Sequence, residues 1–362
     1  MNSRKIILFI FIIFSFFSIK AENIFDSYKK KVYCNSKDSM QLELIEKIDS
    51  YLSKSGSEEF MPKIVTLSQK NNQLIILDQF EYKIIIFNLN SFTNDTRPLK
   101  IIQKSKGKGP NDLVFPIDIL YDDIRDRLYV ADLNNYNIYI YDNEFNEIKR
   151  IKLEFRPYRL FLSLNYLYIT PYDSAIDFCV GRIDLNSDAL IDGIFEPSKR
   201  GNLLEKKARN KLFTVNIDEN ENKFFVTCNY PDFTIYSINS ENIEKAFCNP
   251  ALIKKKLPKP KFIMFENDKK VWGISAFSDL EYSSSMNLLF TLTTLGWTEL
   301  AERKSLNRYI CIFDEEGNTL CEHKILPYNS GEDSIVFDEK NFVIYYATYR
   351  SIWKFKIIKE GQ

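Results

Sequence analysis

Hydrophobic and polar positions follow a recurring pattern along this chain. Each unit is an apolar run of β-branched and aromatic residues, then a polar break, then a second such run. The pattern recurs about every 55 residues, over 74–89, 128–143, 166–185, 223–239, 288–315 and 342–357. Two such runs around a short break predict a β-hairpin, and hairpins repeating at a fixed period predict a β-propeller built blade by blade.

Flanking apolar runs extend each hairpin to a fuller blade. The expected blades cover 63–103, 116–153, 158–195, 211–247, 271–326 and 334–357, and the last holds only three strands. The run Met40–Ile48 alternates as a strand but has no blade of its own. Placed beside Ile352–Ile357, it closes the ring and leaves no sheet edge unpaired. The sequence therefore predicts an all-β, six-bladed β-propeller of four-stranded blades over 59–358. Its closing strand, at about 40–48, lies within an N-terminal segment 22–58, and 359–362 form a tail.

The first residues are expected to lie outside this fold. A short basic start, Asn2–Lys5, precedes the apolar stretch Ile6–Ile19, and Ala21 ends it. A stretch of this length is shorter than the roughly 20 residues of a membrane-spanning helix and is typical of a signal-peptide core. We expect a signal peptide over 1–21, with an uncleaved N-terminal anchor as the alternative. The mature protein is then exported, to the periplasm or the extracellular space, with no membrane span.

Charge narrows the range of partners. Without residues 1–21 the chain has 46 Lys and Arg against 49 Asp and Glu, a net charge of −3. Nucleic-acid-binding proteins usually carry a basic excess, so this class is not expected. Gly is scarce, at 11 residues, whereas Asn is abundant, at 31. Because Asn tolerates left-handed backbone angles, we expect it to occupy turn positions where Gly is more usual.

One blade carries a family resemblance. Residues 107–142 read GKGPNDLVFPIDILYDDIRDRLYVADLNNYNIYIYD. This segment resembles the blades of NHL-repeat and related bacterial six-bladed propellers. The matching positions are Gly107, Gly109, Pro110, Phe115, Pro116, Asp132, Asn135, Ile138, Tyr141 and Asp142. The match is fair over 74–88, where Asp78 repeats the Asp, and decays elsewhere. The resemblance implies the fold and no particular activity.

Within this blade, two motifs have structural explanations. The carboxylate of Asp132 is expected to accept backbone N–H groups in the loop after its strand, in preference to binding a metal or ligand. The sequence GKGP is expected to form a turn, because a phosphate-binding loop needs Gly-Lys-Ser/Thr entering a helix, and here a strand follows.

A search for catalytic residues finds few candidates. His323 is the single histidine, so a His-based catalytic triad is not expected. A metal site of Cys311, Cys321 and His323 is not favoured either. One enzymatic alternative survives: a lactonase or phosphotriesterase-like hydrolase with Ca²⁺ in the central channel, since Ca²⁺ needs only oxygen ligands. Conceivable ligands are Asp118, Asn216, Asn229, Asp232 and Asp279. Apart from this alternative, no cofactor is expected.

Aromatic residues recur at the hairpin breaks and are the main candidates for binding. Every break holds at least one, and the candidate residues are Phe80, Tyr82, Tyr136, Tyr172, Tyr230, Trp297, Tyr349 and the neighbouring Arg350. If the blades are equivalent, these residues emerge on one face. There they either pack between neighbouring blades or form a rim that holds a protein, peptide or glycan, since aromatic and Arg side chains dominate binding surfaces.

Six cysteines in an exported chain permit disulfides. Only Cys311 and Cys321 suggest a pair, because the expected hairpin around Asp314–Asn318 places them opposite one another. The alternative is two half-buried thiols. The sequence thus favours an exported binding or interaction module without catalytic machinery of its own, and the calcium-dependent hydrolase remains the alternative.

Overall fold

The structure is a computed structural model of the 362-residue chain. It describes residues 35–36, 40–49, 62–93, 96–107, 109, 112–172, 180–194, 212–216, 223–228, 234–239, 243–248, 272–273, 277–295, 298–299, 306–328, 333–348 and 351–359. The expected signal peptide, 1–21, and the tail, 359–362 apart from residue 359, lie outside these residues. Among the described residues no helix is long and apolar enough to cross a membrane.

Five antiparallel sheets have four strands each, and each begins at the centre of the ring. The first blade contains β3 (Pro62–Ser68), β4 (Gln73–Asp78), β5 (Lys83–Asn88) and β6 (Lys100–Gln103). The second contains β7 (Pro116–Asp122), β8 (Arg127–Asp132), β9 (Asn137–Tyr141) and β10 (Glu147–Lys152). The third contains β11 (Pro157–Leu162), β12 (Tyr166–Pro171), β13 (Val180–Asp184) and β14 (Ala189–Ile194). The fourth contains β15 (Leu212–Asn216), β16 (Lys223–Cys228), β17 (Thr234–Asn239) and β18 (Ile243–Cys248). The closing blade contains β25 (Ser334–Asp338), β26 (Val343–Thr348), β27 (Ser351–Lys359) and β2 (Met40–Asp49).

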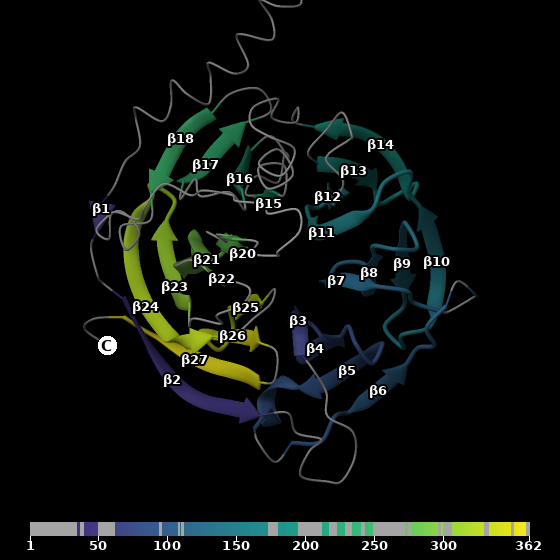
Figure 1. Cartoon of the computed structure of the whole chain (residues 1–362), viewed down its shortest axis with the longest axis horizontal. Coiled ribbons are helices and arrows are strands. Elements are labelled where there is room, and N and C mark those ends of the chain that lie inside the picture. The colour runs from purple at the N-terminus through teal and green to yellow at the C-terminus, as the bar shows by residue number, and fades with distance from the viewer. Residues whose placement is uncertain are drawn as a thin grey trace, which may run out of the picture.

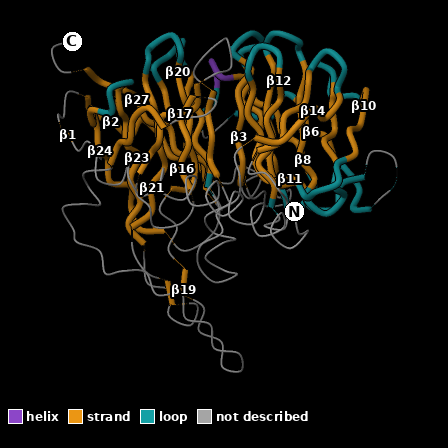
Figure 2. The backbone as a smooth tube through the Cα atoms, turned by 90° about the horizontal axis from the view of Figure 1, so that it is seen from above, coloured by secondary structure: helices purple, strands orange, loops and turns teal. Residues whose placement is uncertain are grey.

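The sixth sheet has five strands. It contains β20 (Phe277–Ser283), β21 (Leu288–Leu295), β23 (Leu306–Asp314), β24 (Asn318–Tyr328) and β1 (Asn35–Ser36). The expectation of six four-stranded blades is therefore corrected to five, because β1 pairs in parallel with the outer edge of β24. Two short strands, β19 (Trp272–Gly273) and β22 (Thr298–Glu299), pair only with one another. Figure 2 shows β19 beyond one end of the ring.

The sheets surround a central axis. Neighbouring inner strands contact one another in a closed series: β3, β7, β11, β15, β20, β25 and again β3. Figure 1 looks down this axis, with these strands at the centre and β6, β10, β14, β18 and β24 on the outside. The chain is thus an all-β β-propeller with four-stranded blades.

The N-terminal strand completes the closing blade as the sequence predicts. Strand β2 pairs antiparallel with β27, with Leu42 opposite Ile357 and Ile48 opposite Ile352. The innermost strand of this blade, β25, and its outermost strand, β2, come from opposite ends of the described chain. Joining them ties the two ends together and protects the edge of β27, which would otherwise be free to pair with other chains.

The core lies between neighbouring sheets. All side chains of Leu74–Leu77 and Ile84–Phe87, on the middle strands of the first blade, are buried. Those of Ile75 and Ile84 pack toward the second blade, against residues such as Val130 and Tyr139. Because both faces of a middle strand are covered, these strands appear in the sequence as continuous apolar runs. This explains why the six hairpins, including β12–β13 and β26–β27, were recognisable from the sequence.

The expected disulfide is absent. Cys311 and Cys321 are both buried thiols. A register shift after Ile312 in the β23–β24 pair places Cys321 opposite Ile312, and Cys311 faces Glu322. Since successive residues of a strand point to opposite faces of its sheet, the two thiols enter different cores. Of the two possibilities left open by the sequence, the structure has the two thiols, because the bridge would need a hairpin without this shift.

Turn positions with left-handed angles are only partly as expected. Asn72 and Asn287 take positive φ, as the high Asn content predicted. Tyr82, Tyr136 and Phe342, however, also take positive φ, between 55° and 58°. A bulky residue is uncommon there, and the left-handed conformation costs about 1–2 kcal/mol. The surrounding turn must therefore fix these aromatic residues in place.

Candidate functional site

The predicted binding residues lie in the turns that join the second and third strands of the blades. We call the surface formed by these turns the turn face, and its described part comprises residues 79–82, residues 133–136 and Tyr172. Because every blade begins with its innermost strand, equivalent turns emerge at the same end of the ring. The other candidates, Tyr230, Trp297, Tyr349 and Arg350, lie outside the described residues.

Aspartates at the ends of the second strands build these turns. The carboxylate of Asp78 accepts the N–H groups of Phe80 and Glu81, each at 3.0 Å. A further main-chain bond fixes the end of the first turn, where the Lys104 N–H donates to the Tyr82 carbonyl at 2.9 Å. In the second blade the Leu153 N–H donates likewise to the Tyr136 carbonyl at 2.8 Å. The backbone on both sides of each tyrosine is therefore held in place.

Each of three turns holds a tyrosine beside a basic side chain. The Lys106 Nζ lies 5.9 Å from the ring centroid of Tyr82. The Lys152 Nζ lies 5.4 Å from that of Tyr136. These basic residues come from the outer strand of the same blade or from the loop that follows it, which returns to the turn face.

The third pair is the closest. The guanidinium carbon of Arg156 lies 4.7 Å from the ring centroid of Tyr172, and the Tyr172 N–H donates to the Arg156 carbonyl at 2.7 Å. Cations within about 6 Å of an aromatic ring are attracted to its face, by about 0.5–1 kcal/mol at exposed sites. The turn face thus presents aromatic rings with positive charge beside them.

The described aromatic residues divide between packing and exposure. Tyr82 and Tyr172 are partly buried and pack against the cores between the blades. Phe80 and Tyr136 are 52% and 37% exposed. Of the two roles weighed from the sequence, packing between blades fits the first pair, and contact with a ligand fits the second.

Asp132 has the structural role expected of it. Its carboxylate accepts the N–H groups of Val114 at 2.7 Å and Phe115 at 3.0 Å from the loop before the blade. It also accepts the N–H groups of Asn134 and Asn135, both at 3.2 Å, within its own turn. One buried carboxylate therefore joins the entry loop of the second blade to the turn face.

Of the GKGP segment the structure describes Gly107 and Gly109, and both bond to the loop that follows: the Gly107 N–H donates to the Leu113 carbonyl, and the Asp112 N–H donates to the Gly109 carbonyl. The Gly109 N–H donates to the Asp112 carboxylate at 2.9 Å. A Cβ atom on Gly107 would lie 2.4 Å from the same carboxylate, so a side chain at this position would displace it. Glycine is needed at position 107 because the backbone lies close to the Asp112 carboxylate, and this contact explains the residue without a phosphate site.

Charged side chains meet on the inner strands. The Asp118 carboxylate on β7 accepts the Leu160 N–H of β11 at 2.7 Å, and the Arg159 guanidinium lies 3.4 Å from it. Burial raises the pKa of Asp118 to about 7, and Arg159 opposes this increase. Asp118 therefore fastens the second blade to the third.

Two further acidic side chains, Asp279 and Glu281, lie on β20. The Asp279 carboxylate accepts the Ile335 N–H of β25 at 2.8 Å and fastens the five-stranded sheet to the closing blade. Burial raises the pKa of Asp279, and Arg159 opposes this increase too. Burial, helped by the charges of Asp279, Glu339 and Asp118, raises the pKa of Glu281 to about 8. Asp118 on β7 and Asp279 on β20 therefore both interact electrostatically with Arg159.

This arrangement offers limited support for a calcium site. Asp118 and Asp279 are two of the five conceivable ligands; the side chain of Asn216 is not described, and Asn229 and Asp232 lie outside the described residues. Asp118 uses one carboxylate oxygen on a backbone N–H, Asp279 uses both, and Arg159 already supplies positive charge. In the part of the chain that the structure describes, no three acidic, His or Cys side chains are arranged to hold a metal.

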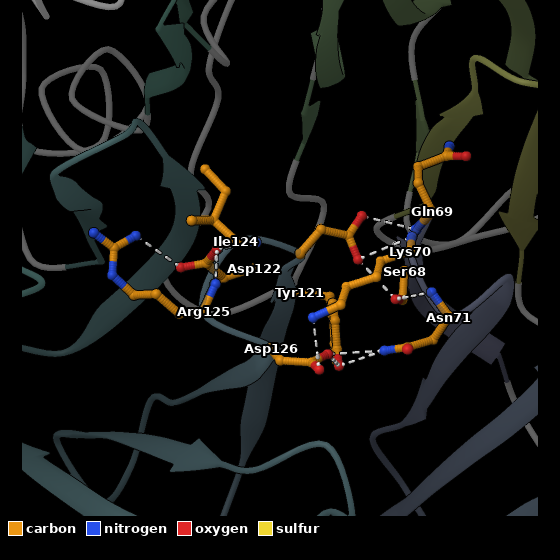
Figure 3. A network of polar contacts seen from close by, with 10 residues as sticks. Ser68, Gln69, Lys70, Asn71, Tyr121, Asp122, Ile124, Arg125 and Asp126 are labelled. Atoms are coloured by element: carbon orange, nitrogen blue, oxygen red, sulfur yellow. Dashed lines mark hydrogen bonds and ion pairs between the residues drawn. The ribbon is translucent and has the colours of Figure 1, made fainter.

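The opposite ends of the inner strands carry a polar network between blades (Figure 3). Asp123, after β7, accepts the Ser68 hydroxyl at 2.7 Å and the Gln69 N–H at 2.8 Å from the first blade. Glu339, after β25, accepts the Ser285 hydroxyl of the five-stranded sheet at 2.8 Å in the same way. An acidic residue just after an inner strand therefore recurs as a link to the preceding sheet.

Asp126 adds a second link in Figure 3. It accepts the Tyr121 hydroxyl at 2.5 Å and the Asn71 side-chain amide at 2.9 Å, and its carboxylate lies 2.9 Å from the Lys70 Nζ. These three donors lower the pKa of Asp126 to about 2. Because Asp123 and Asp126 already accept from side chains and backbone of the neighbouring blade, and Asp122 accepts from its own turn, the role of this network is structural.

Sequence reasoning named Asp118 and Asp279 but did not identify the basic partners of the turn face, Arg159 or Glu281. Lys106 follows the outer strand of the first blade, whereas Lys152 ends the outer strand of the second blade and Arg156 directly precedes β11. These places are not equivalent, so aligning the blades by their hairpins would not have shown a shared basic position. Arg159 and Glu281 carry no such signal, because only closure of the ring brings β11 and β20 near one another.

Comparisons with known proteins identify the fold. No family model matches the chain, and no curated protein matches it. A member of the DUF4221 family from Bacteroides vulgatus superposes with a TM-score of 0.56 at 9% identity, over 89% of this chain and 99% of that one. A Bacteroides fragilis protein whose name describes it as exported superposes with a TM-score of 0.55 at 13% identity, over 91% of this chain and 99% of that one.

These similarities agree with the strand order in defining a β-propeller. At such low identity they show the fold alone. The resemblance to NHL-repeat blades stays a resemblance, because no family model supports that family.

Proposed function

We propose that this chain is an exported binding module that captures a protein, peptide or glycan on its turn face. The observation that carries the proposal is the recurrence of a tyrosine beside a basic side chain in three successive blades. Rigid aromatic rings bind apolar or sugar surfaces, and the adjacent cations favour ligands that also carry acidic groups. We also propose that the five-stranded sheet serves as the sixth blade, since its inner strand β20 completes the closed series of contacts.

Export has two supports. The apolar stretch Ile6–Ile19 after a basic start is typical of a signal peptide. One structural neighbour is described as exported, although at 13% identity it shares only the fold.

A double variant, Phe80→Ala with Tyr136→Ala, tests the proposal. Both rings are exposed, so their removal is expected to leave the fold cooperative and to weaken ligand capture by about 1–3 kcal/mol, roughly five-fold to 150-fold. The variant and the unaltered chain are screened in parallel on a glycan array and in pull-downs from the cell envelope, and each hit is titrated as a purified ligand.

Phe342→Ala is the matched control. Phe342 is 39% exposed, takes a φ of 55° and has the Lys359 Nζ 5.8 Å from its ring, but it lies in the turn between the first two strands of its blade. Its removal should leave capture unchanged. Equal affinity of the double variant and the unaltered chain for every hit would refute the proposal.

The calcium-dependent hydrolase is the second candidate, favoured by the acidic side chains that share Arg159 in the channel. Calorimetric titration with Ca²⁺, with and without prior chelation, tests it. A stoichiometric site that Asp118→Asn removes would support the hydrolase and justify assays with lactones and phosphoesters. Absence of heat and of any change in Tm would count against it.

A further inference from the structure

A cavity lies on the outside of the ring, between the first and second blades. Its volume is about 440 Å³. One wall is the outer strand of the first blade, with Ile101, Ile102 and Lys104, and the other is the turn between β9 and β10, with Phe145, Asn146 and Glu147. Sites for small molecules typically measure about 300–1,000 Å³, so the size suits such a ligand. The cavity belongs neither to the turn face nor to the channel.

Lys104 brings an unpaired charge to this cavity. Its side chain is only 9% exposed, and its ammonium has no hydrogen bond or ion pair with any described residue. The Nζ lies 4.5 Å from the ring centroid of Tyr141. Burial lowers the pKa of Lys104, and the charge of Glu147 partly opposes this. Lysine is rarely so buried without a partner, because removing its charge from water is costly.

Two oxygen atoms near Lys104 are unsatisfied, and one of them, on Glu147, lines the cavity. Oε2 of Glu147 is buried without a hydrogen bond, although Oε1 accepts from Arg150 at 2.9 Å. The Tyr141 hydroxyl is also buried without a hydrogen-bond partner among the described residues. Buried polar groups in folded proteins almost always have partners. The Lys104 ammonium, without a partner among the described residues, and the unsatisfied Oε2 of Glu147 both line this cavity. Together they indicate a bound partner that supplies both an acceptor and a donor.

We propose that this cavity binds a small ligand with a carboxylate, an adjacent N–H donor and an apolar side chain. The carboxylate lies against the Lys104 ammonium, the N–H donates to the Glu147 carboxylate, and the side chain contacts Ile101, Ile102 and Phe145. Either a free apolar amino acid or the C-terminal residue of a peptide has this chemistry.

Three probes separate the two sources and test the need for a carboxylate. Free leucine carries an ammonium group, N-acetyl-leucine has the amide N–H of a peptide C-terminus, and leucinamide lacks the carboxylate. Binding to the full mature chain is measured by calorimetry and by saturation-transfer NMR at millimolar concentrations. We expect saturable binding of leucine or N-acetyl-leucine and none of leucinamide. Absence of saturable binding of both carboxylate probes, or equal binding of leucinamide, would overturn the proposal.

Lys104→Met is the decisive variant. It keeps the length of the side chain and removes the charge, so carboxylate binding should weaken at least about ten-fold, because a charge-assisted hydrogen bond is lost. The Tm of the ligand-free protein should rise, since an unpaired buried ammonium is gone. If Lys104 only packs on Tyr141, the Tm should instead fall and probe binding should be unaffected, and that result would refute the proposal.

Lys149→Met is the control, because Lys149 is on β10 and pairs with Asp188 at 2.9 Å on the exposed surface. It should change neither binding nor Tm. Glu147→Gln provides a second test if Lys104→Met fails to fold. This variant should weaken free leucine more than N-acetyl-leucine, because only leucine presents an ammonium to the lost charge. Unchanged binding of both probes to Glu147→Gln would exclude the site.

Discussion

At the scale of single residues, a few aspartates define the turns of this propeller. Asp132 shows how much one carboxylate can hold, since four backbone N–H groups from two segments donate to it. The sequence showed this role because a short acidic side chain after an apolar strand is typical of such turns. The left-handed tyrosines were not predictable, because the preference for Asn or Gly at positive φ would have placed another residue there.

Replacing Asp132 should destabilise the whole protein. In Asp132→Ala the N–H groups of Val114 and Phe115 lose a charged acceptor in a buried setting, which costs roughly 1.5–3 kcal/mol for each strong bond. We expect the free energy of unfolding, measured by urea denaturation, to fall by about 3 kcal/mol or more. Asp184→Ala removes an aspartate whose bond to the Asn186 N–H lies in an exposed turn, so its effect should be far smaller than that of Asp132→Ala. Equal effects of the two substitutions would contradict this assignment.

At the scale of strands and hairpins, the sequence was most informative where both faces of a strand are buried. The middle strands appear as unbroken apolar runs, whereas the outer strands, such as β6 with its exposed Ile101, carry a weaker pattern. Register was harder to predict than strand position. The register shift after Ile312 in the β23–β24 pair changes which side chains of the two strands share a face of the sheet. No residue near Ile312 indicates such a bulge in the sequence.

The two buried thiols provide a test of this register. After unfolding without reductant, Cys311 and Cys321 should both be alkylated by iodoacetamide, as read by peptide mass spectrometry. In the folded protein both should react slowly, because they are buried. A peptide in which the two cysteines are linked would show that the strands pair without the shift.

At the scale of the whole molecule, closing the ring is what brings distant residues together. The blades could be predicted separately, since each depends on a local pattern. The approach of Asp118 and Asp279 to Arg159 and Glu281, and the cavity between β6 and β10, could not be predicted, because they need the twist and packing of neighbouring blades. The same dependence gives β2 its importance, since the closing blade has no outer strand without it.

Two residues of β2 allow this importance to be measured. Ile48 is 2% exposed and Leu44 is 44% exposed on the same strand. Ile48→Ala leaves a cavity in the core beside β27 and should lower the free energy of unfolding by about 2–5 kcal/mol. Leu44→Ala should change it by less than about 0.5 kcal/mol. Similar losses from both substitutions would mean that β2 contributes through its backbone pairing alone.

The channel acids should make the stability of the whole ring depend on pH. Glu281 has a pKa raised from 4.5 to about 8 in the folded protein. Between these values the folded state keeps a proton that the unfolded state has released, so raising the pH favours unfolding. The raised pKa of Asp118, about 7, acts in the same direction. The free energy of unfolding should therefore fall as the pH rises from about 5 to 8.

Glu281→Gln isolates this effect, because glutamine cannot lose a proton. Its free energy of unfolding should depend less steeply on pH, and at pH 8 the variant should be more stable than the unaltered chain. Glu316→Gln, in the exposed turn between β23 and β24, is the control and should keep the original slope. Urea titrations at several pH values measure all three proteins. If Glu281→Gln retained the full pH dependence of the free energy of unfolding, the acidic side chains of β20 would have to be more hydrated than their position in the ring indicates. The buried acids near Arg159 would then not limit the stability of the propeller.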